Sequence, residues 1–170
     1  MKLFSFLIIM IASSSLSLSQ NLEGFENMCE GYISGTIPLA SPNQLSFELD
    51  RTDKVVILDA REEKEFKVSH IPNSINVGFD NFDISSVKSI SKDAKIYIYC
   101  SIGYRSESVG EKLKAAGYKN VFNVEGGIFS WANQGFSLVD NDEKPTQTVH
   151  GYDKKWSKWL NPEKCKSVIE

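Results

Sequence analysis

The chain has 170 residues, enough for one packed domain with extensions and too few for two full domains. It carries 19 Lys and Arg against 22 Asp and Glu, a formal net charge of -3, and no basic run or basic face studded with aromatics. These features argue against a protein that binds nucleic acid. Any anion that the protein handles has to be attracted by a local arrangement of groups.

Residues 1–19 have the pattern of a secretory signal peptide. Lys2 supplies the charged start, residues 3–12 form an apolar core, and the serine-rich stretch 13–19 precedes a cleavage point at Gln20. The apolar core has about half of the ~20 residues that a membrane span needs, so an uncleaved anchor is the weaker alternative. We therefore expect an exported protein, periplasmic or secreted, with no stable membrane insertion after cleavage.

Apolar runs alternate with amphipathic stretches in the rest of the chain. Ser41 and Pro42 mark a helix start, and Gly117 ends the longest helix. The expected elements are an irregular N-terminal extension at 20–40, a helix at 41–49, a strand at 55–58, a helix at 62–68, a strand at 74–77, a weak helix or loop at 82–90, a strand at 95–99, a helix at 106–116, a strand at 120–124 and a helix at 128–134.

Strands and helices that alternate with short connections predict an α/β fold, in which a parallel sheet is covered by helices on both faces. Ligands bind to such sheets outside the carboxyl ends of the strands. Asp59, Cys100 and the turn at 125–127 all follow predicted strands. We expect the functional site at that edge of the sheet.

The C-terminal tail, residues 140–170, is polar at first and closes with Trp156, Trp159 and Leu160 at helical spacing. We expect a short helix that covers the domain's own apolar surface, with a partner-binding face as the alternative. The main domain then spans residues 41–139.

The chain has three cysteines, and in an exported protein they can form disulfides. A disulfide between Cys29 and Cys165 would tie the two extensions together, which oxidising surroundings permit. Sequence does not show whether the two thiols meet, so the bond stays open. Cys100 is then the odd cysteine, expected to be reactive or paired between molecules. A resolving role of Cys29 toward Cys100 is a weaker alternative.

The segment around Cys100 carries the most chemical information. Cys100 ends an apolar strand, and a short loop leads from it to Arg105 at a helix start. Backbone N–H groups of such a loop converge on one point, and the helix N-terminus adds partial positive charge there. This arrangement favours a thiolate that acts as a nucleophile. A buried, inert thiol is the structural alternative.

Four segments in register resemble the motifs of single-domain rhodaneses, and together they cover about Leu45 to Val139. They are residues 56–61 (VILDAR), 69–72 (SHIP), 98–106 (IYCSIGYRS) and 125–131 (EGGIFSW). The resemblance implies the rhodanese-like fold, with about five parallel strands flanked by helices. Ser69 departs from the family's usual Gly before His-Ile-Pro.

The resemblance also implies that Cys100 carries sulfane sulfur as a persulfide. The loop residues whose amides would cradle that sulfur and bind substrate are Ser101, Ile102, Gly103, Tyr104 and Arg105. Arg105 would neutralise an anionic donor, because a cation at a helix N-terminus needs an anion partner. The implied reaction moves sulfur from a thiosulfate-like donor to a thiol or cyanide.

Residues near the loop have structural or rim roles in this interpretation. We expect Asp59 and Arg61 to pair and shape the rim of the pocket, with capping of the next turn as the alternative for Asp59. His70 is expected to make a fixed hydrogen bond in the turn before Pro72. No Cys or His cluster has the spacing of metal ligands, so neither a metal nor another cofactor is expected.

Two other classes of function remain open. Phosphatases of a related architecture use a Cys-x5-Arg loop, whereas the loop here is Cys-x4-Arg, with fewer amides to surround a tetrahedral phosphate. A non-catalytic sulfur carrier or interaction module is the third alternative. The expected partners are a small sulfur donor and a thiol acceptor, and the acceptor could also be a protein or a thiol reductant. The uncharged residues between Cys100 and Arg105 do not distinguish one sulfur donor from another.

Overall fold

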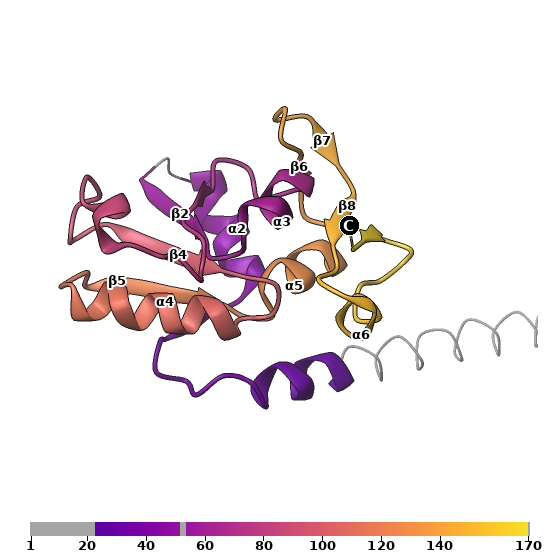
Figure 1. The fold of residues 1–170 in the computed structure, drawn as a ribbon, viewed down its shortest axis with the longest axis horizontal. Helices are drawn as coiled ribbons and strands as arrows, with labels where there is room; N and C mark the ends of the chain where they lie inside the picture. The colour runs from indigo at the N-terminus through magenta and orange to yellow at the C-terminus, as the bar shows by residue number, and fades with distance from the viewer. Residues whose placement is uncertain (1–22, 52–53, 170) are drawn as a thin grey trace, which may run out of the picture.

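The protein is built around one parallel β-sheet, seen at the centre of the ribbon in Figure 1. The computed structural model describes residues 23–51 and 54–169, and the predicted signal peptide lies outside them. Five strands pair in the order β1-β5-β4-β2-β3, all parallel. They are β1 (Leu39–Ala40), β2 (Val55–Asp59), β3 (Ile75–Asn76), β4 (Lys95–Tyr99) and β5 (Asn120–Val124). The predicted α/β fold with a five-stranded parallel sheet is confirmed.

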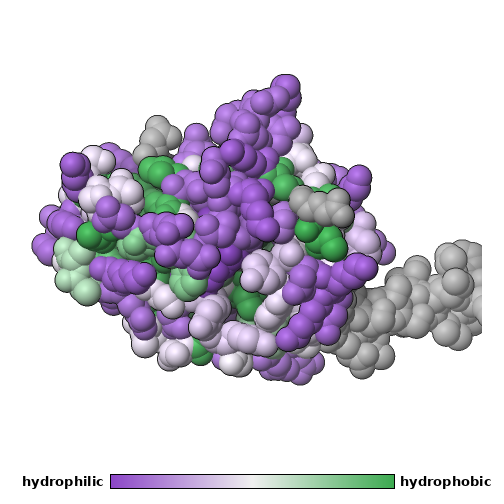
Figure 2. Space-filling view, in the orientation of Figure 1, coloured by the Kyte–Doolittle hydropathy of each residue, from purple (hydrophilic) through white to green (hydrophobic). Residues whose placement is uncertain are grey.

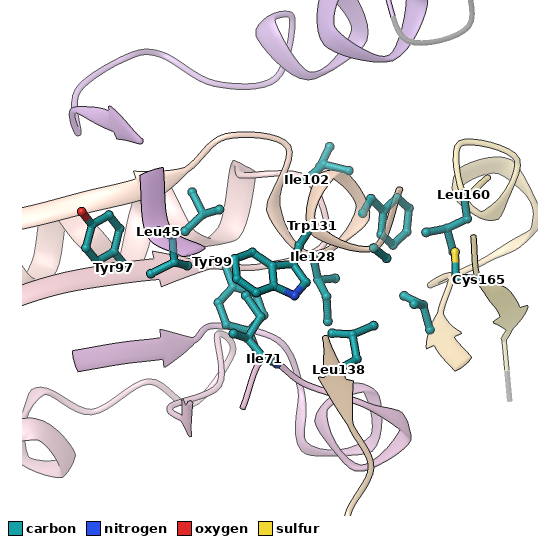
Figure 3. Packing of buried hydrophobic residues seen from close by; sticks show 14 of the residues in the cluster. Leu45, Ile71, Tyr97, Tyr99, Ile102, Ile128, Trp131, Leu138, Leu160 and Cys165 are labelled. Carbon is teal, nitrogen blue, oxygen red and sulfur yellow. The ribbon is translucent and has the colours of Figure 1, made fainter. Parts of the chain in front are cut away.

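Helices cover both faces of this sheet. They are α2 (Pro42–Arg51), α3 (Glu63–Val68), the 3-10 helix η1 (Ile84–Val87), α4 (Tyr104–Ala115) and α5 (Gly127–Asn133). Side chains alternate along β4: Tyr97 and Tyr99 pack with α2 and α5, whereas Ile96 and Ile98 pack with α4. Figure 3 shows part of the first cluster, with Trp131 of α5 among tyrosine and aliphatic side chains. Burial on both faces explains the continuous apolar run of this strand.

The helix that follows Cys100 starts earlier than predicted. It begins at Tyr104 rather than Ser106, directly after Gly103, whose φ of 114° suits glycine. The other helices and strands predicted within the main domain end within two residues of their expected positions, apart from the segment at 82–90, which forms only η1. No helix among the described residues is long and apolar enough to cross a membrane. The face shown in Figure 2 is largely hydrophilic, with small hydrophobic patches.

Part of the described N-terminal extension has regular secondary structure, which corrects in part the expectation of an irregular segment at 20–40. Residues 23–30 are helical, and β1 joins the main sheet beside β5. Phe25 and Cys29 lie one turn apart on this helix, and both are buried. The ring centroid of Phe25 lies 6.0 Å from that of Trp159. The apolar face of this short helix is recognisable only once the C-terminal tail that covers it is in place.

The C-terminal segment adds two small sheets. Strands β6 (Leu138–Val139) and β7 (Pro145–Thr146) form an antiparallel pair, and β8 (Thr148–His150) pairs in parallel with β9 (Lys166–Val168). The expected tryptophan helix is the single turn α6 (Lys154–Ser157), which ends before Trp159. Trp156 and Trp159 nevertheless pack against the main core. In Figure 1 the N-terminal helix (indigo) lies next to α6 (yellow), so the two extensions cover each other.

The three cysteines are buried and free, so the structure does not contain the disulfide between Cys29 and Cys165 that the sequence left open. Both thiols lie in the same hydrophobic cluster. Burial, the largest cause, raises the pKa of Cys29 to about 12 and that of Cys165 to about 11. These two thiols are protonated at neutral pH and act as core side chains.

Gly127 lets the start of α5 approach the loop after β4. The N–H of Ile128 donates to the carbonyl of Cys100 at 2.9 Å, and the N–H of Phe129 donates to that of Ser101 at 3.2 Å. A Cβ on Gly127, whose φ is 53°, would overlap the Cys100 carbonyl oxygen. The glycine is required for contact between α5 and the loop.

We expect Gly127→Ala to lower the free energy of unfolding by about 2 to 3 kcal/mol, because the added methyl meets backbone rather than a flexible side chain. Gly135→Ala is the matched control, since Gly135 has a φ of 78° but no atom closer than 3.9 Å to its added Cβ. The control should lose only about 1 kcal/mol. Denaturant unfolding measures both, and equal losses would contradict the steric role of Gly127.

Candidate active site

Cys100 follows β4 at the carboxyl edge of the sheet, with its side chain buried. Its Sγ accepts a hydrogen bond from the backbone N–H of Gly103 at 3.2 Å. The left-handed conformation of Gly103 turns this N–H toward the sulfur, and α4 begins at the next residue. The sulfur therefore lies beside the positive end of a helix of 12 residues.

A buried polar cluster holds the back of the loop. Ser106 Oγ lies 2.7 Å from Oδ1 of Asn123 and 3.1 Å from the carbonyl oxygen of Gly103, so its single hydroxyl hydrogen can be donated to either acceptor. Asn123 Nδ2 donates to the same Gly103 carbonyl at 2.9 Å. Asn123 lies on β5, so the neighbouring strand positions the peptide that contacts the sulfur. Asn123 was not predicted as a site residue, and its only signal was a polar side chain between the apolar Phe122 and Val124 of β5.

Arg105 is bound by a protein carboxylate. Its Nη1 donates to Glu65 Oε2 at 2.6 Å and its Nη2 to Glu65 Oε1 at 2.8 Å, a bidentate pair. Nη2 also donates to Ser101 Oγ at 2.9 Å. Burial alone would raise the pKa of Glu65, but Arg105 and then Arg61 hold it below its usual value. The anion partner that the sequence led us to expect from substrate is supplied by α3.

Glu65 was missed as a site residue because sequence placed it only in the acidic first turn of a short helix. Its side chain is buried, unlike that of its neighbour Glu63. The signal that pointed to it was indirect: a cation near a helix N-terminus requires a negative partner. Only the folded chain shows which carboxylate that is.

Asp59 and Arg61 pair, but they do not form a rim. Both side chains are fully buried, with Arg61 Nη2 2.6 Å from Asp59 Oδ2. The same nitrogen donates to the Ser69 carbonyl at 2.7 Å, and the Arg61 guanidinium lies 5.6 Å from the ring of Tyr99. The expected rim position is wrong, because neither residue lines the cavity at Cys100. The pair instead joins the end of β2 to the segment after α3.

His70 has the structural position that was expected. Its Nδ1 is hydrogen-bonded to the Phe66 carbonyl at 3.1 Å, its Nε2 lies 3.2 Å from Glu143, and its ring stacks on Phe66. Within residues 23–51 and 54–169, no three His, Cys, Asp or Glu side chains are grouped as a metal site would require.

A cavity of about 520 Å³ opens in front of Cys100. Four of the five predicted loop residues line it, whereas Gly103 lies behind the sulfur and contributes its N–H. Side chains from both extensions, unforeseen in the sequence, complete the wall. The lining residues are Tyr32, Glu62, Phe79, Asp80, Cys100, Ser101, Ile102, Tyr104, Arg105, Tyr152 and Trp156.

We expect Glu65→Gln to cost about 3 kcal/mol of folding stability, because it leaves the partly buried Arg105 without its counter-charge. Glu63→Gln on the same helix is the control, since it breaks only an exposed pair with Lys67 and should leave stability nearly unchanged. Thermal or denaturant unfolding of the two variants checks this. Similar stability of the two would show that the Arg105–Glu65 pair contributes little.

Comparison with known proteins agrees with this geometry. The profile of the Rhodanese-like domain family matches residues 41–134, more than half of the chain. A sulfurtransferase of Allochromatium vinosum is 34% identical over 95 residues, which cover 56% of this chain and 88% of that protein. The putative sulfur carrier protein YrkF of Bacillus subtilis is 29% identical over 99 residues, 58% of this chain and 53% of that protein.

The chain spans only part of several longer relatives. The adenylyltransferase and sulfurtransferase uba4 of Ogataea parapolymorpha is 31% identical over 78 residues, 46% of this chain but 20% of that protein. Among solved structures, the rhodanese-related protein from Thermoplasma volcanium has a TM-score of 0.53 and 30% identity, covering 60% of this chain and 97% of its own. With the parallel sheet and the cysteine loop in place, these matches show that the chain belongs to the rhodanese-like domain family.

Proposed function

We propose that this protein is a sulfurtransferase that carries sulfane sulfur as a persulfide on Cys100. The observation that carries the proposal is the position of Cys100 Sγ: it accepts the Gly103 N–H at the start of α4 and faces a cavity large enough for a substrate. The sulfurtransferase and sulfur-carrier relatives support the same chemistry. Cys29 and Cys165 lack this setting, since burial keeps both protonated.

The reaction consists of two displacements at sulfur. The Cys100 thiolate attacks the outer sulfur of a thiosulfate-like donor, the donor S–S bond breaks, and its electron pair leaves with sulfite. An acceptor thiolate or cyanide then attacks the outer sulfur of the persulfide. The bond between that sulfur and Cys100 breaks, and the thiolate is restored.

The loop stabilises negative charge during both steps. The Gly103 N–H and the N-terminus of α4 face the sulfur, and they need no reorganisation as charge moves onto it. Arg105 faces the same cavity, but Glu65 already neutralises much of its charge. Arg105 then acts mainly by holding Ser101 and the loop in position.

Cys100→Ser should abolish sulfur loading, because the serine hydroxyl is not ionised at neutral pH and forms no persulfide. Mass spectrometry of the reduced protein after exposure to thiosulfate should show a gain of about 32 Da, one sulfur atom, in the wild type and none in the variant. Cys29→Ser and Cys165→Ser are matched controls that should still gain the mass. Loading that persists in Cys100→Ser would contradict the assignment.

Turnover separates an enzyme from a carrier. An enzyme consumes many equivalents of thiosulfate per chain when cyanide or a thiol is supplied, whereas a carrier loads once and waits for a specific protein acceptor. Phosphatase chemistry makes the opposite prediction, namely turnover of an aryl phosphate without a mass gain on Cys100. That result would overturn the proposal in favour of the Cys-x5-Arg class.

We also propose that the protein is exported, on the basis of the charged start and apolar core at its N-terminus. The expected mature chain begins at Gln20, which N-terminal peptide mapping of the protein recovered from outside the cytoplasm would measure. A full-length N-terminus on a protein retained in the cytoplasm would contradict export. In an oxidising compartment, a thiol reductant or rapid persulfide formation has to keep Cys100 from irreversible oxidation.

A further inference from the structure

We propose that the cavity in front of Cys100 selects sulfur compounds with an aromatic or apolar organic body, and that Tyr32, Tyr152 and Trp156 determine this specificity. The inference rests on the proposed sulfur transfer and names the class of substrate for the same site. These three residues lie outside residues 41–134, the part matched by the rhodanese-like family. The selectivity would therefore belong to this chain's own extensions.

Aromatic rings from both ends of the chain meet at the cavity. Tyr32 and Trp156 are in an edge-to-face arrangement, with ring centroids 5.1 Å apart. Phe79 and Tyr104 add two more rings to the wall. Aromatic walls stabilise flat or apolar groups by stacking and by removing them from water. A volume of about 520 Å³ is that of an organic-ligand site, and a compact inorganic anion would fill only a small part of it.

The charges around the cavity argue against a site built for a small dianion. Among the described residues that line it, Arg105 is the only cation, and Glu65 pairs with it in bidentate fashion. Two carboxylates, Glu62 and Asp80, also line the wall. The Glu62 carboxylate accepts the N–H groups of Phe79 and Asp80 and so is held in place. Binding energy has to come mainly from the apolar wall.

Tyr152 is held over the site at a cost in backbone conformation. Its φ of 65° is uncommon for a residue with a bulky side chain, and such conformations persist only where the surroundings impose them. Its N–H donates to Nδ1 of His150 at 3.1 Å, and burial lowers the pKa of His150, which keeps this acceptor neutral. The guanidinium of Arg105 lies 5.4 Å from the Tyr152 ring.

A helix cap positions Trp156. The Asp153 carboxylate caps α6 by accepting the N–H groups of Lys155 and Trp156. Trp159, on the same tail, packs on Phe25 instead and does not line the cavity. Both tryptophans of the tail pack against the core, but only Trp156 also lines the cavity, so the two provide an internal comparison.

The test uses two donors of equal charge, methanethiosulfonate and benzenethiosulfonate. In each, Cys100 thiolate takes the outer sulfur, the S–S bond breaks, and the electron pair leaves with a sulfinate. The measured quantity is the ratio of the second-order rate constant for sulfur loading of Cys100 by the aromatic donor to that for loading by the methyl donor. Comparing this ratio between variants removes the intrinsic difference in reactivity of the two donors.

We expect the ratio to fall about tenfold in Tyr152→Asn and in Trp156→Ala, the loss expected for one aromatic contact. Tyr152→Asn should keep the fold, because Asn tolerates the left-handed backbone and Tyr152 is 52% exposed. It therefore tests the proposal even where Trp156→Ala fails to fold. Trp159→Leu is the matched control and should keep the wild-type ratio. Circular dichroism confirms folding of each variant.

The outcomes distinguish the two proposals. If both donors load Cys100 but the ratio is the same in Tyr152→Asn and the wild type, the specificity inference is overturned and sulfur transfer stands. A fall in Trp159→Leu equal to that in Tyr152→Asn would also overturn it, because the effect would then come from the tail as a whole. If neither donor adds sulfur to Cys100 in the wild type, both proposals fail.

Discussion

The bidentate ion pair between Arg105 and Glu65 is the interaction on which the site depends. It joins the first turn of α4 to α3, and through Ser101 it fixes the loop that begins at Cys100. Two charges at this depth are stable only because each satisfies the other, since removal of either leaves an unpaired charge in a poorly solvated place. The loop is therefore preorganised before any substrate arrives.

This pair also changes the electrostatics expected of the site. A free arginine would make the cavity cationic and suited to small anions. Because Arg105 is paired, the groups that attract negative charge are the Gly103 N–H and the N-terminus of α4. Both are partial charges that act over a short range. Such short-range charges stabilise a sulfur atom that is already bound, but they attract a dianion from solution only weakly. Recognition of the sulfur donor therefore depends on the rest of the cavity wall.

Three side chains of that wall, Tyr32, Tyr152 and Trp156, come from outside the family domain. The helix at 23–30 and the turn α6 lie against each other, with Phe25 on Trp159 and Tyr32 on Trp156. Both tryptophans pack against the core, and the contact between Tyr32 and Trp156 also lines the cavity at Cys100. The extensions thus stabilise the domain and shape its site through neighbouring contacts. A substitution that alters the packing of the extensions therefore also alters the cavity.

Sequence alone determined the elements whose signal is local. Strands β4 and β5 were predicted to the residue because short segments rich in β-branched and aromatic residues define them. The loop from Cys100 to Arg105 was identified from its place between a strand and a helix. The tertiary structure decided everything that needs a distant partner: β1 as a strand, Glu65 as the partner of Arg105, the burial of Asp59 and Arg61, and the aromatic wall. A residue's neighbours along the chain carry propensity and periodicity, but burial and ion pairing depend on groups that only folding brings together.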